Sequence, residues 1–143
     1  MSDLVDQLIA GAGLYAGKQS THGDEPGEGV ARILVSPLPG GAGVEMDYEV
    51  IVADAGIVHA EHALLTRTAG GNVLVTSHIH APITAVVPEA EPGWFPADAG
   101  AAPFPMAVRI ELPEPGRIVY SWSYAEPGGE LRVRDVGDVR LVP

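Results

Sequence analysis

The strongest constraint on the fold is a series of turn signals that interrupts the chain at short intervals. These signals combine Gly with Pro, Asp or Asn, which tight turns favour, and they lie at 37–41, 54–56, 69–72, 113–116 and 127–129. Between them, apolar and polar residues mostly alternate, which is the period of a strand with one buried face. The pattern predicts strands at 14–21, 29–35, 44–52, 57–67, 72–80, 83–87, 106–112, 117–124, 130–134 and 137–142.

The short connections determine how these strands should pair. Parallel neighbours need a long crossover, usually a helix, and no crossover helix is evident here. Only the N-terminus has a helical pattern. Ser2 or Asp3 can cap it, Gly11 or Gly13 can end it, and its apolar stripe comprises Leu4, Val5, Leu8 and Ile9. The sequence predicts an all-β single domain over 1–143, an up-and-down antiparallel barrel of about ten strands, with a β-sandwich as the alternative. The proline-rich stretch 89–105 predicts a long loop.

Composition narrows the partners and the setting. The chain has 143 residues and a formal net charge of −11. This charge repels the phosphate backbone, so we do not expect nucleic acid to be a partner. No apolar run approaches the roughly 20 residues of a membrane helix, and the N-terminus lacks a secretory pattern. Cysteine is absent, so disulfides and thiolate metal sites are excluded. We expect a cytoplasmic protein that does not bind membranes. Whether it forms a homodimer does not follow from the sequence.

The strand at 44–52 indicates which of its faces points inward. Glu45, Asp47 and Glu49 alternate with apolar residues, so the acidic set should face water. The predicted inner set is Val44, Met46, Tyr48 and Val50.

Turn lengths extend this assignment to the next two strands. A two-residue loop at 54–55 places Tyr48 opposite Glu61 and Val50 opposite His59, and a second at 70–71 places Glu61 opposite His80. An inward-facing patch would then gather residues from three neighbouring strands: Tyr48, His59, Glu61, His78 and His80. A three-residue loop at either turn would reverse the assignment.

A row of aromatic residues follows the turn at 113–116. Tyr120, Trp122 and Tyr124 alternate with small residues and share one face of the predicted strand 117–124. These rings could line a cavity and stack on a planar or apolar ligand, or they could fill the barrel core. Tyr120 and Trp122 join the candidate ligand-binding residues.

The histidines and the carboxylate of the patch admit three kinds of chemistry. His59, Glu61, His78 and His80 could converge on zinc or iron with an open position for a substrate. Glu61 beside a histidine could instead orient a polar ligand or act in acid–base catalysis. A satisfied polar network is the third interpretation. The pattern alone assigns neither a metal nor a catalytic residue.

The run from Gly56 to Arg67 resembles a strand of nitrobindin-like proteins, whose pattern is G-x-x-His-Ala-Glu-x-Gly-x-x-Arg. His59, Ala60 and Glu61 match it, whereas Ala63 stands where the family favours Gly, and the Arg is displaced by one. The segment 13–17 also resembles the family's opening strand with Tyr in place of its Trp, and 77–83 agrees loosely with a further strand. The resemblance implies a ten-stranded calycin-type barrel, similar to fatty-acid-binding proteins, that binds haem. The family ligates haem through a His near its C-terminus, but the last His here is His80, so the cofactor stays unknown.

These observations lead to a binding protein as the first hypothesis. Its partner would be a small hydrophobic or planar molecule, held in a cavity lined by Val44, Met46, Tyr48, Tyr120 and Trp122. One alternative is a haem- or metal-dependent enzyme of the same fold, such as an isomerase or an activity on reactive nitrogen species. The other is a packed structural or interaction domain. Without a catalytic signature, the default expectation is that the protein is not an enzyme.

Overall fold

The structure, a computed structural model, describes residues 3–21, 27–78, 83–97, 102, 104–126 and 128–143. Strands dominate it. The elements are α1 (Leu4–Ala10), β1 (Gly13–Thr21), β2 (Gly27–Pro37), the 3₁₀ turn η1 (Pro39–Gly41), β3 (Gly43–Val52), β4 (Gly56–Thr68), β5 (Gly71–His78), β6 (Ile83–Pro88), β7 (Trp94–Ala97), β8 (Met106–Glu114), β9 (Arg117–Tyr124) and β10 (Arg132–Leu141).

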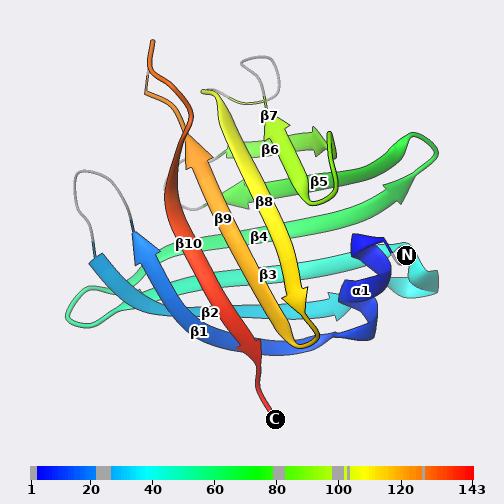
Figure 1. Cartoon of the computed structure of the whole chain (residues 1–143), viewed down its shortest axis with the longest axis horizontal. Coiled ribbons are helices and arrows are strands. Elements are labelled where there is room, and N and C mark those ends of the chain that lie inside the picture. The colour runs from blue at the N-terminus through cyan, green and yellow to red at the C-terminus, as the bar shows by residue number, and fades with distance from the viewer. Residues whose placement is uncertain (1–2, 22–26, 79–82, 98–101, 103, 127) are drawn as a thin grey trace.

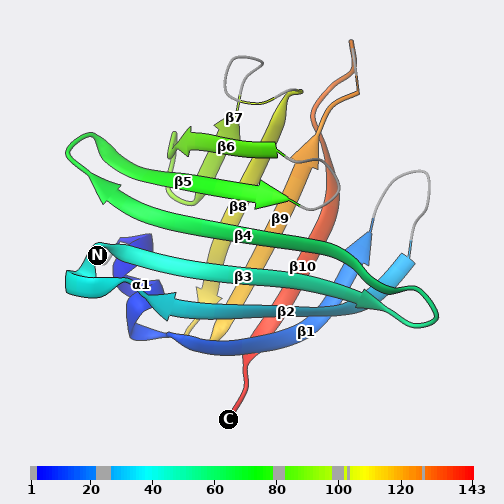
Figure 2. The ribbon, with the colours of Figure 1, turned by 180° about the vertical axis from the view of Figure 1, so that it is seen from behind.

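All ten strands form one antiparallel sheet in the order β6-β5-β4-β3-β2-β1-β10-β9-β8-β7. Its end strands, β6 and β7, contact each other, so the sheet is a nearly closed barrel. In Figures 1 and 2, β8, β9 and β10 cross on the opposite side of the barrel from β2 to β5. The prediction of an all-β up-and-down barrel with a short N-terminal helix is confirmed.

Two predicted boundaries are wrong. The predicted strands 130–134 and 137–142 are parts of one strand, β10, because pairing with β1 on one side and β9 on the other keeps the chain extended past Gly137. The predicted loop 89–105 contains β7, which pairs with β8 despite Pro96. A proline lacks the N–H that a central strand must donate, but β7 lies at the end of the sheet, where one side needs no partner.

The short helix α1 is fixed by one cap, one ion-pair cluster and two buried side chains. The Asp3 carboxylate accepts a hydrogen bond from the Asp6 N–H at 2.8 Å, as its predicted capping role requires. Val5 and Leu8 are buried against β2, β3 and β4, at one end of the barrel (Figure 1). Arg67 of β4 binds Asp3 at 3.1 Å and also pairs with Asp6. Docking compensates for the low stability that a seven-residue helix has alone.

The inward face of β3 is the predicted one. Val44, Met46, Tyr48 and Val50 are all buried in the core, whereas Asp47 is exposed. On β4, the buried positions His59, Glu61, Ala63 and Leu65 continue this inner face. The alternation therefore directs the histidine and carboxylate of β4 into the barrel.

The β3–β4 register is confirmed, although the predicted turn is not. The connection has three residues, Ala53 to Ala55, with Asp54 in the left-handed region at φ 68°. A bulge at Val58 then restores the predicted pairs, Val50 with His59 and Tyr48 with Glu61. The extra residue in the bulge offsets the extra residue in the turn, so the side chains keep their predicted faces.

The β4–β5 register differs from the prediction by two residues. The turn is formed by Ala69 and Gly70 instead of Gly70 and Gly71, and Glu61 therefore pairs with His78, not His80. A shift of two residues preserves the face on which each side chain lies. His78 consequently points inward as predicted, and it lies directly opposite Glu61.

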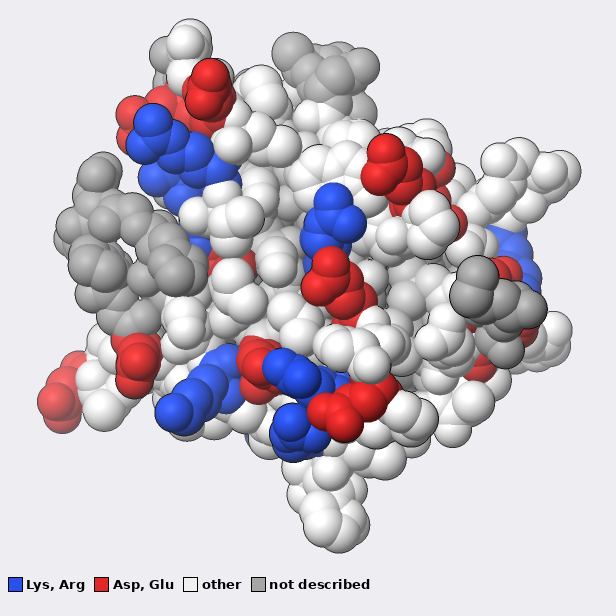
Figure 3. All heavy atoms as spheres, viewed as in Figure 1, with Lys and Arg blue, Asp and Glu red and all other residues white. Residues whose placement is uncertain are grey.

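On one face of the molecule, charged side chains of both signs intermix. In Figure 3, Lys and Arg lie beside Asp and Glu and do not gather in a patch of their own. Arg117 of β9, for example, forms two hydrogen bonds with Asp138 of β10, at 2.9 and 2.7 Å. In the described part of the chain, no helix is long and apolar enough to span a membrane.

Candidate functional site

A polar cluster lies inside the barrel where β3, β4, β5 and β9 face one another. The rings of Tyr48 and His59 are 5.4 Å apart between centroids, those of His59 and His78 also 5.4 Å, and those of His78 and Trp122 5.1 Å. The structure therefore brings together six of the seven predicted site residues: Tyr48, His59, Glu61, His78, Tyr120 and Trp122. His80 lies outside the described residues.

Glu61 is the centre of this cluster. Its oxygen Oε1 accepts hydrogen bonds from the Thr76 hydroxyl at 2.6 Å and from the Tyr120 hydroxyl. Its other oxygen, Oε2, faces His59 Nε2 at 3.5 Å and His78 Nδ1 at 3.8 Å. The side chain of Glu61 has no exposed surface, so all its partners come from the protein interior.

The surroundings of Glu61 favour the ionised carboxylate. Burial on its own raises the pKa, but the hydrogen bond from His59, the charge of His78 and the hydroxyls of Thr76 and Tyr120 outweigh it, and the net pKa of Glu61 is lowered. Burial and the adjacent Glu61 charge raise the pKa of Tyr120 well above its usual value. Tyr120 therefore stays a neutral hydrogen-bond donor to the carboxylate.

This shift predicts an acid-dependent stability. An unfolded glutamate titrates at about pH 4.3, so the stabilisation from Glu61 is complete above that pH and is lost as the pH falls through the lower folded pKa. We expect the free energy of unfolding, measured in urea, to fall more steeply with acidification in the wild-type protein than in Glu61→Gln. Equal acid slopes in the two proteins would contradict the lowered pKa.

Three polar residues of the site were not predicted from the sequence. Thr76 lies two residues before His78 on β5, so period-two alternation already places it on the inner face. Gln19 accepts a hydrogen bond from the Tyr48 hydroxyl and donates one to Asp135 at 3.0 Å. Gln19 and Asp135 belong to β1 and β10, the first and last strands of the chain, which are neighbours in the sheet, and no local signal indicates that pairing.

The absence of a side chain at Gly137 of β10 leaves room for the ring of Tyr48. A Cβ atom at Gly137 would lie 2.8 Å from the Tyr48 hydroxyl oxygen and 3.3 Å from Gln19 Oε1. Because real side-chain contacts are longer, any larger residue would push the ring away. The missing side chain thus permits the hydrogen bond between Tyr48 and Gln19.

Trp122 forms the aromatic wall of the cluster. Its ring lies 6.0 Å from that of His59 and 4.8 Å from that of Tyr124, between centroids, and Tyr124 in turn contacts Phe104. The indole N–H of Trp122 is buried, and among the described residues it has no hydrogen-bond acceptor. A buried indole N–H usually finds a partner, so this donor is available to a bound molecule or to water.

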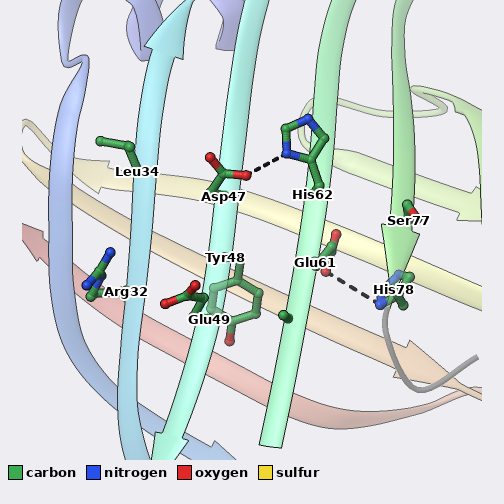
Figure 4. Close-up of a pocket in the computed structure, with 10 residues that line it drawn as sticks. Arg32, Leu34, Asp47, Tyr48, Glu49, Glu61, His62, Ser77 and His78 are labelled. Atoms are coloured by element: carbon green, nitrogen blue, oxygen red, sulfur yellow. Dashed lines mark hydrogen bonds and ion pairs between the residues drawn. The ribbon is translucent and has the colours of Figure 1, made fainter. Parts of the chain in front are cut away.

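A hollow of about 320 Å³ lies over β2 to β5, and its lining includes Tyr48, Glu61 and His78 of the internal cluster (Figure 4). Its outward-facing lining includes Arg32, Asp47 and His62, and Figure 4 shows Asp47 and His62 pointing toward each other. The side chain of His62 is half exposed, and its Nδ1 lies 2.5 Å from Asp47 Oδ1. The hollow therefore borders the internal cluster and shares these three residues with it.

Two groups of side chains have the composition of a metal site. One is the internal triad of His59, Glu61 and His78, and the other is the outer group of Glu45, Asp47 and His62; in each, the ligand atoms lie within 4.8 Å of one another. The internal triad is buried, whereas Asp47 and His62 of the outer group are exposed.

Comparison with known proteins gives no further guide to function. Neither the models of known protein families nor the curated proteins contain a match to this chain.

Proposed function

We propose that the protein binds a small apolar or planar molecule inside the barrel and orients it with the His59–Glu61–His78 triad. The observation that carries this proposal is the composition of the internal cluster, in which one buried carboxylate and two imidazoles lie among the rings of Tyr48, Tyr120 and Trp122. Ligand sites typically combine an apolar, aromatic lining with a few converging polar groups.

The indole N–H of Trp122 further supports this proposal. This donor is buried without an acceptor among the described residues and lies on the ring that packs against His78. A ligand with a carbonyl, carboxylate or ether oxygen would satisfy it, while its apolar part would contact the aromatic rings. The ligand class that fits best is a small, mostly apolar molecule with one oxygen acceptor.

The resemblance of 56–67 to nitrobindin-like barrels supports the same kind of function, because that family and the similar fatty-acid-binding proteins hold ligands inside a barrel. We do not extend the family's haem ligation to this chain, since its C-terminal segment contains no histidine. If the barrel binds haem, the iron must take a different axial ligand from the family's.

Ligand binding can be tested with two probes, the apolar dye ANS and haemin. We expect native protein to bind one of them with a stoichiometry of one, observed as dye fluorescence or as a Soret band. Loss of one hydrogen bond to a ligand, worth about 1.4 kcal/mol, weakens binding about tenfold. Trp122→Phe should therefore raise the dissociation constant about tenfold, and the exposed control His62→Ala should not change it.

Other results would contradict the proposal that the barrel binds a ligand. Native mass spectrometry of freshly purified protein would reveal a retained ligand that neither probe resembles. If no ligand is retained and both probes stay unbound, the barrel is a packed domain and the binding proposal fails. His80→Ala tests separately whether the remaining predicted site residue contributes.

A further inference from the structure

Inside the barrel, three potential metal-ligand atoms lie close together. They are His59 Nε2 and Glu61 Oε2 on β4 and His78 Nδ1 on β5, and all three atoms lie within 4.8 Å of one another. We propose that these atoms bind a divalent transition-metal ion of the zinc or iron type. This inference goes beyond the proposed binding of an organic ligand and does not depend on it.

The spacing of the three atoms is also compatible with coordination of one metal ion. A charged hydrogen bond between an imidazole and a carboxylate measures about 2.7–2.9 Å, but Glu61 Oε2 lies 3.5 Å from His59 Nε2 and 3.8 Å from His78 Nδ1. Two ligands bound tetrahedrally at about 2.1 Å from one ion are about 3.4 Å apart. The observed separations are close to that value, and small side-chain rotations would complete the site.

The second oxygen of Glu61 is already held by other groups. Thr76 donates a hydrogen bond to Oε1 at 2.6 Å, and the Tyr120 hydroxyl donates another to the same atom. These two bonds fix the plane of the carboxylate and direct Oε2 toward the imidazoles. Outer hydrogen bonds of this kind commonly orient the carboxylate ligands of metal sites.

Neighbouring rings hold the two histidines. Trp122 packs against His78 and His59, with centroids 5.1 and 6.0 Å away, and Tyr48 packs edge-on against His59 at 5.4 Å. The imidazoles are thereby restricted to a few orientations before any ion binds. Preorganised ligands lose little conformational entropy on binding.

The charge at the cluster also suits a cation. Among the described residues, the ion pairs of Glu61 are with His59 and His78 and none is with Lys or Arg. A buried carboxylate needs a positive partner. A divalent ion supplies it while both imidazoles stay neutral, which is the form in which histidine binds metals.

Three protein ligands leave at least one position on the ion open. Two histidines and one glutamate form the ligand set of several catalytic zinc sites, and two histidines with a carboxylate also bind iron(II) in oxygenases. The open position would accept water or an oxygen atom of a bound molecule. The class of ligand is therefore a small oxygen-donor molecule of the kind that the buried Trp122 N–H could also contact.

The outer group of Glu45, Asp47 and His62 provides a matched control within the same barrel. It offers the same ligand types, but the side chains of His62 and Asp47 are half exposed, and His62 Nδ1 already pairs with Asp47 at 2.5 Å. Exposed acidic groups are common on protein surfaces without an ion. We therefore do not propose a metal at this outer group, and His62→Ala serves as the control.

The experiment is a titration of chelator-treated full-length protein with Co²⁺ and Zn²⁺, followed by calorimetry and by the visible spectrum of Co²⁺. We expect one equivalent of each ion to bind and Co²⁺ to give the intense bands of a four-coordinate site. Thr76→Val, which removes one of the two hydrogen bonds to Glu61 Oε1, should weaken Zn²⁺ binding about tenfold. His59→Ala should weaken it at least that much, and His62→Ala should leave it unchanged.

Tryptophan fluorescence supplies a readout that locates the ion. Co²⁺ bound at the triad should quench Trp122, because that ring contacts both histidines. Quenching should persist in Trp94→Phe and disappear in Trp122→Phe, although calorimetry still detects the ion in both. Circular dichroism will establish that each variant is folded.

Two results would overturn the proposal. One is the absence of stoichiometric binding by folded wild-type protein. The other is binding that is lost in His62→Ala but retained in folded His59→Ala, which would place the ion on the outer face. Either result can occur while ANS or haemin still binds in the barrel, so the metal site and the ligand proposal fail separately.

Discussion

Glu61→Ala should lower the free energy of unfolding by about 4 kcal/mol at neutral pH in the presence of a chelator. The Thr76 and Tyr120 hydroxyls are buried and both donate to Glu61 Oε1. Alanine would leave these donors without their acceptor, at about 1–3 kcal/mol each. It would also leave a cavity beside His59 and His78, which adds to the loss.

Two other glutamate variants distinguish this cause from a general effect of charge. Glu61→Gln keeps an oxygen acceptor and nearly the same volume, so we expect it to lose no more than about half as much stability as alanine does. Glu49→Ala removes a carboxylate from the outer face of the neighbouring strand β3, and should change stability by less than about 0.5 kcal/mol. Urea unfolding followed by tryptophan fluorescence would compare them. Wild-type stability in Glu61→Ala would mean that the two hydroxyls find other acceptors.

The fold was predictable because the sequence of one strand shows which of its faces is buried. From Val44 to Val50, acidic residues alternate with apolar ones, and burial of Tyr48 beside exposed Asp47 follows from that alternation. Hairpin connections then determine the order of the neighbouring strands with few alternatives. The weak alternation in 132–141 and the proline in β7 concealed the true bounds of those strands.

The site was predictable only for residues that are close in sequence and lie on the same strand. His59 and Glu61 lie two residues apart on β4, so they share a face whatever the turn. The pairing of Glu61 with His78 instead of His80 depends on whether the turn begins at Ala69 or Gly70, and the run of small residues there permits both. Turn composition alone does not distinguish two registers that leave every side chain on the same face.

Contacts across the barrel were beyond sequence reasoning. Tyr120 reaches Glu61 from β9, and Asp135 reaches Gln19 from β10, over sequence separations of 59 and 116 residues. The aromatic row of β9 predicted an inner face but not its partner on the other side. The pairing of β1 with β10 brings the first and last strands together, and it depends on residues that carry no chemical motif.

Gly17 is the clearest of those residues, and Gly17→Ala should destabilise the barrel by about 3 kcal/mol or more. A Cβ atom at this position would lie 2.1 Å from the carbonyl oxygen of Asp138 and 2.9 Å from Cα of Val139. Both are backbone atoms of β10, which cannot rotate away as a flexible side chain can. The added methyl group must therefore separate β1 from β10 where the two pair.

Thermal unfolding and hydrogen exchange would test this prediction at two levels. A loss of 3 kcal/mol corresponds to a decrease in Tm of about 10 °C for a domain of this size. Exchange should accelerate first in the β1 and β10 amides that pair around Gly17, and less in β4 and β5. Gly70→Ala is the matched control, because its Cβ atom would meet nothing closer than 3.9 Å.

The pattern of hydrogen exchange distinguishes local opening of β1 and β10 from global unfolding as the cause of a stability loss. If β1 and β10 open selectively, the cause is the close approach of the two backbones, and Tyr48 should also lose its contact with Gln19 beside them. If all strands exchange equally, unfolding is global and the pairing near Gly17 has no local weakness. An unchanged Tm would show that β10 can move away from β1 without cost, and closure of the barrel would then not depend on glycine at this position.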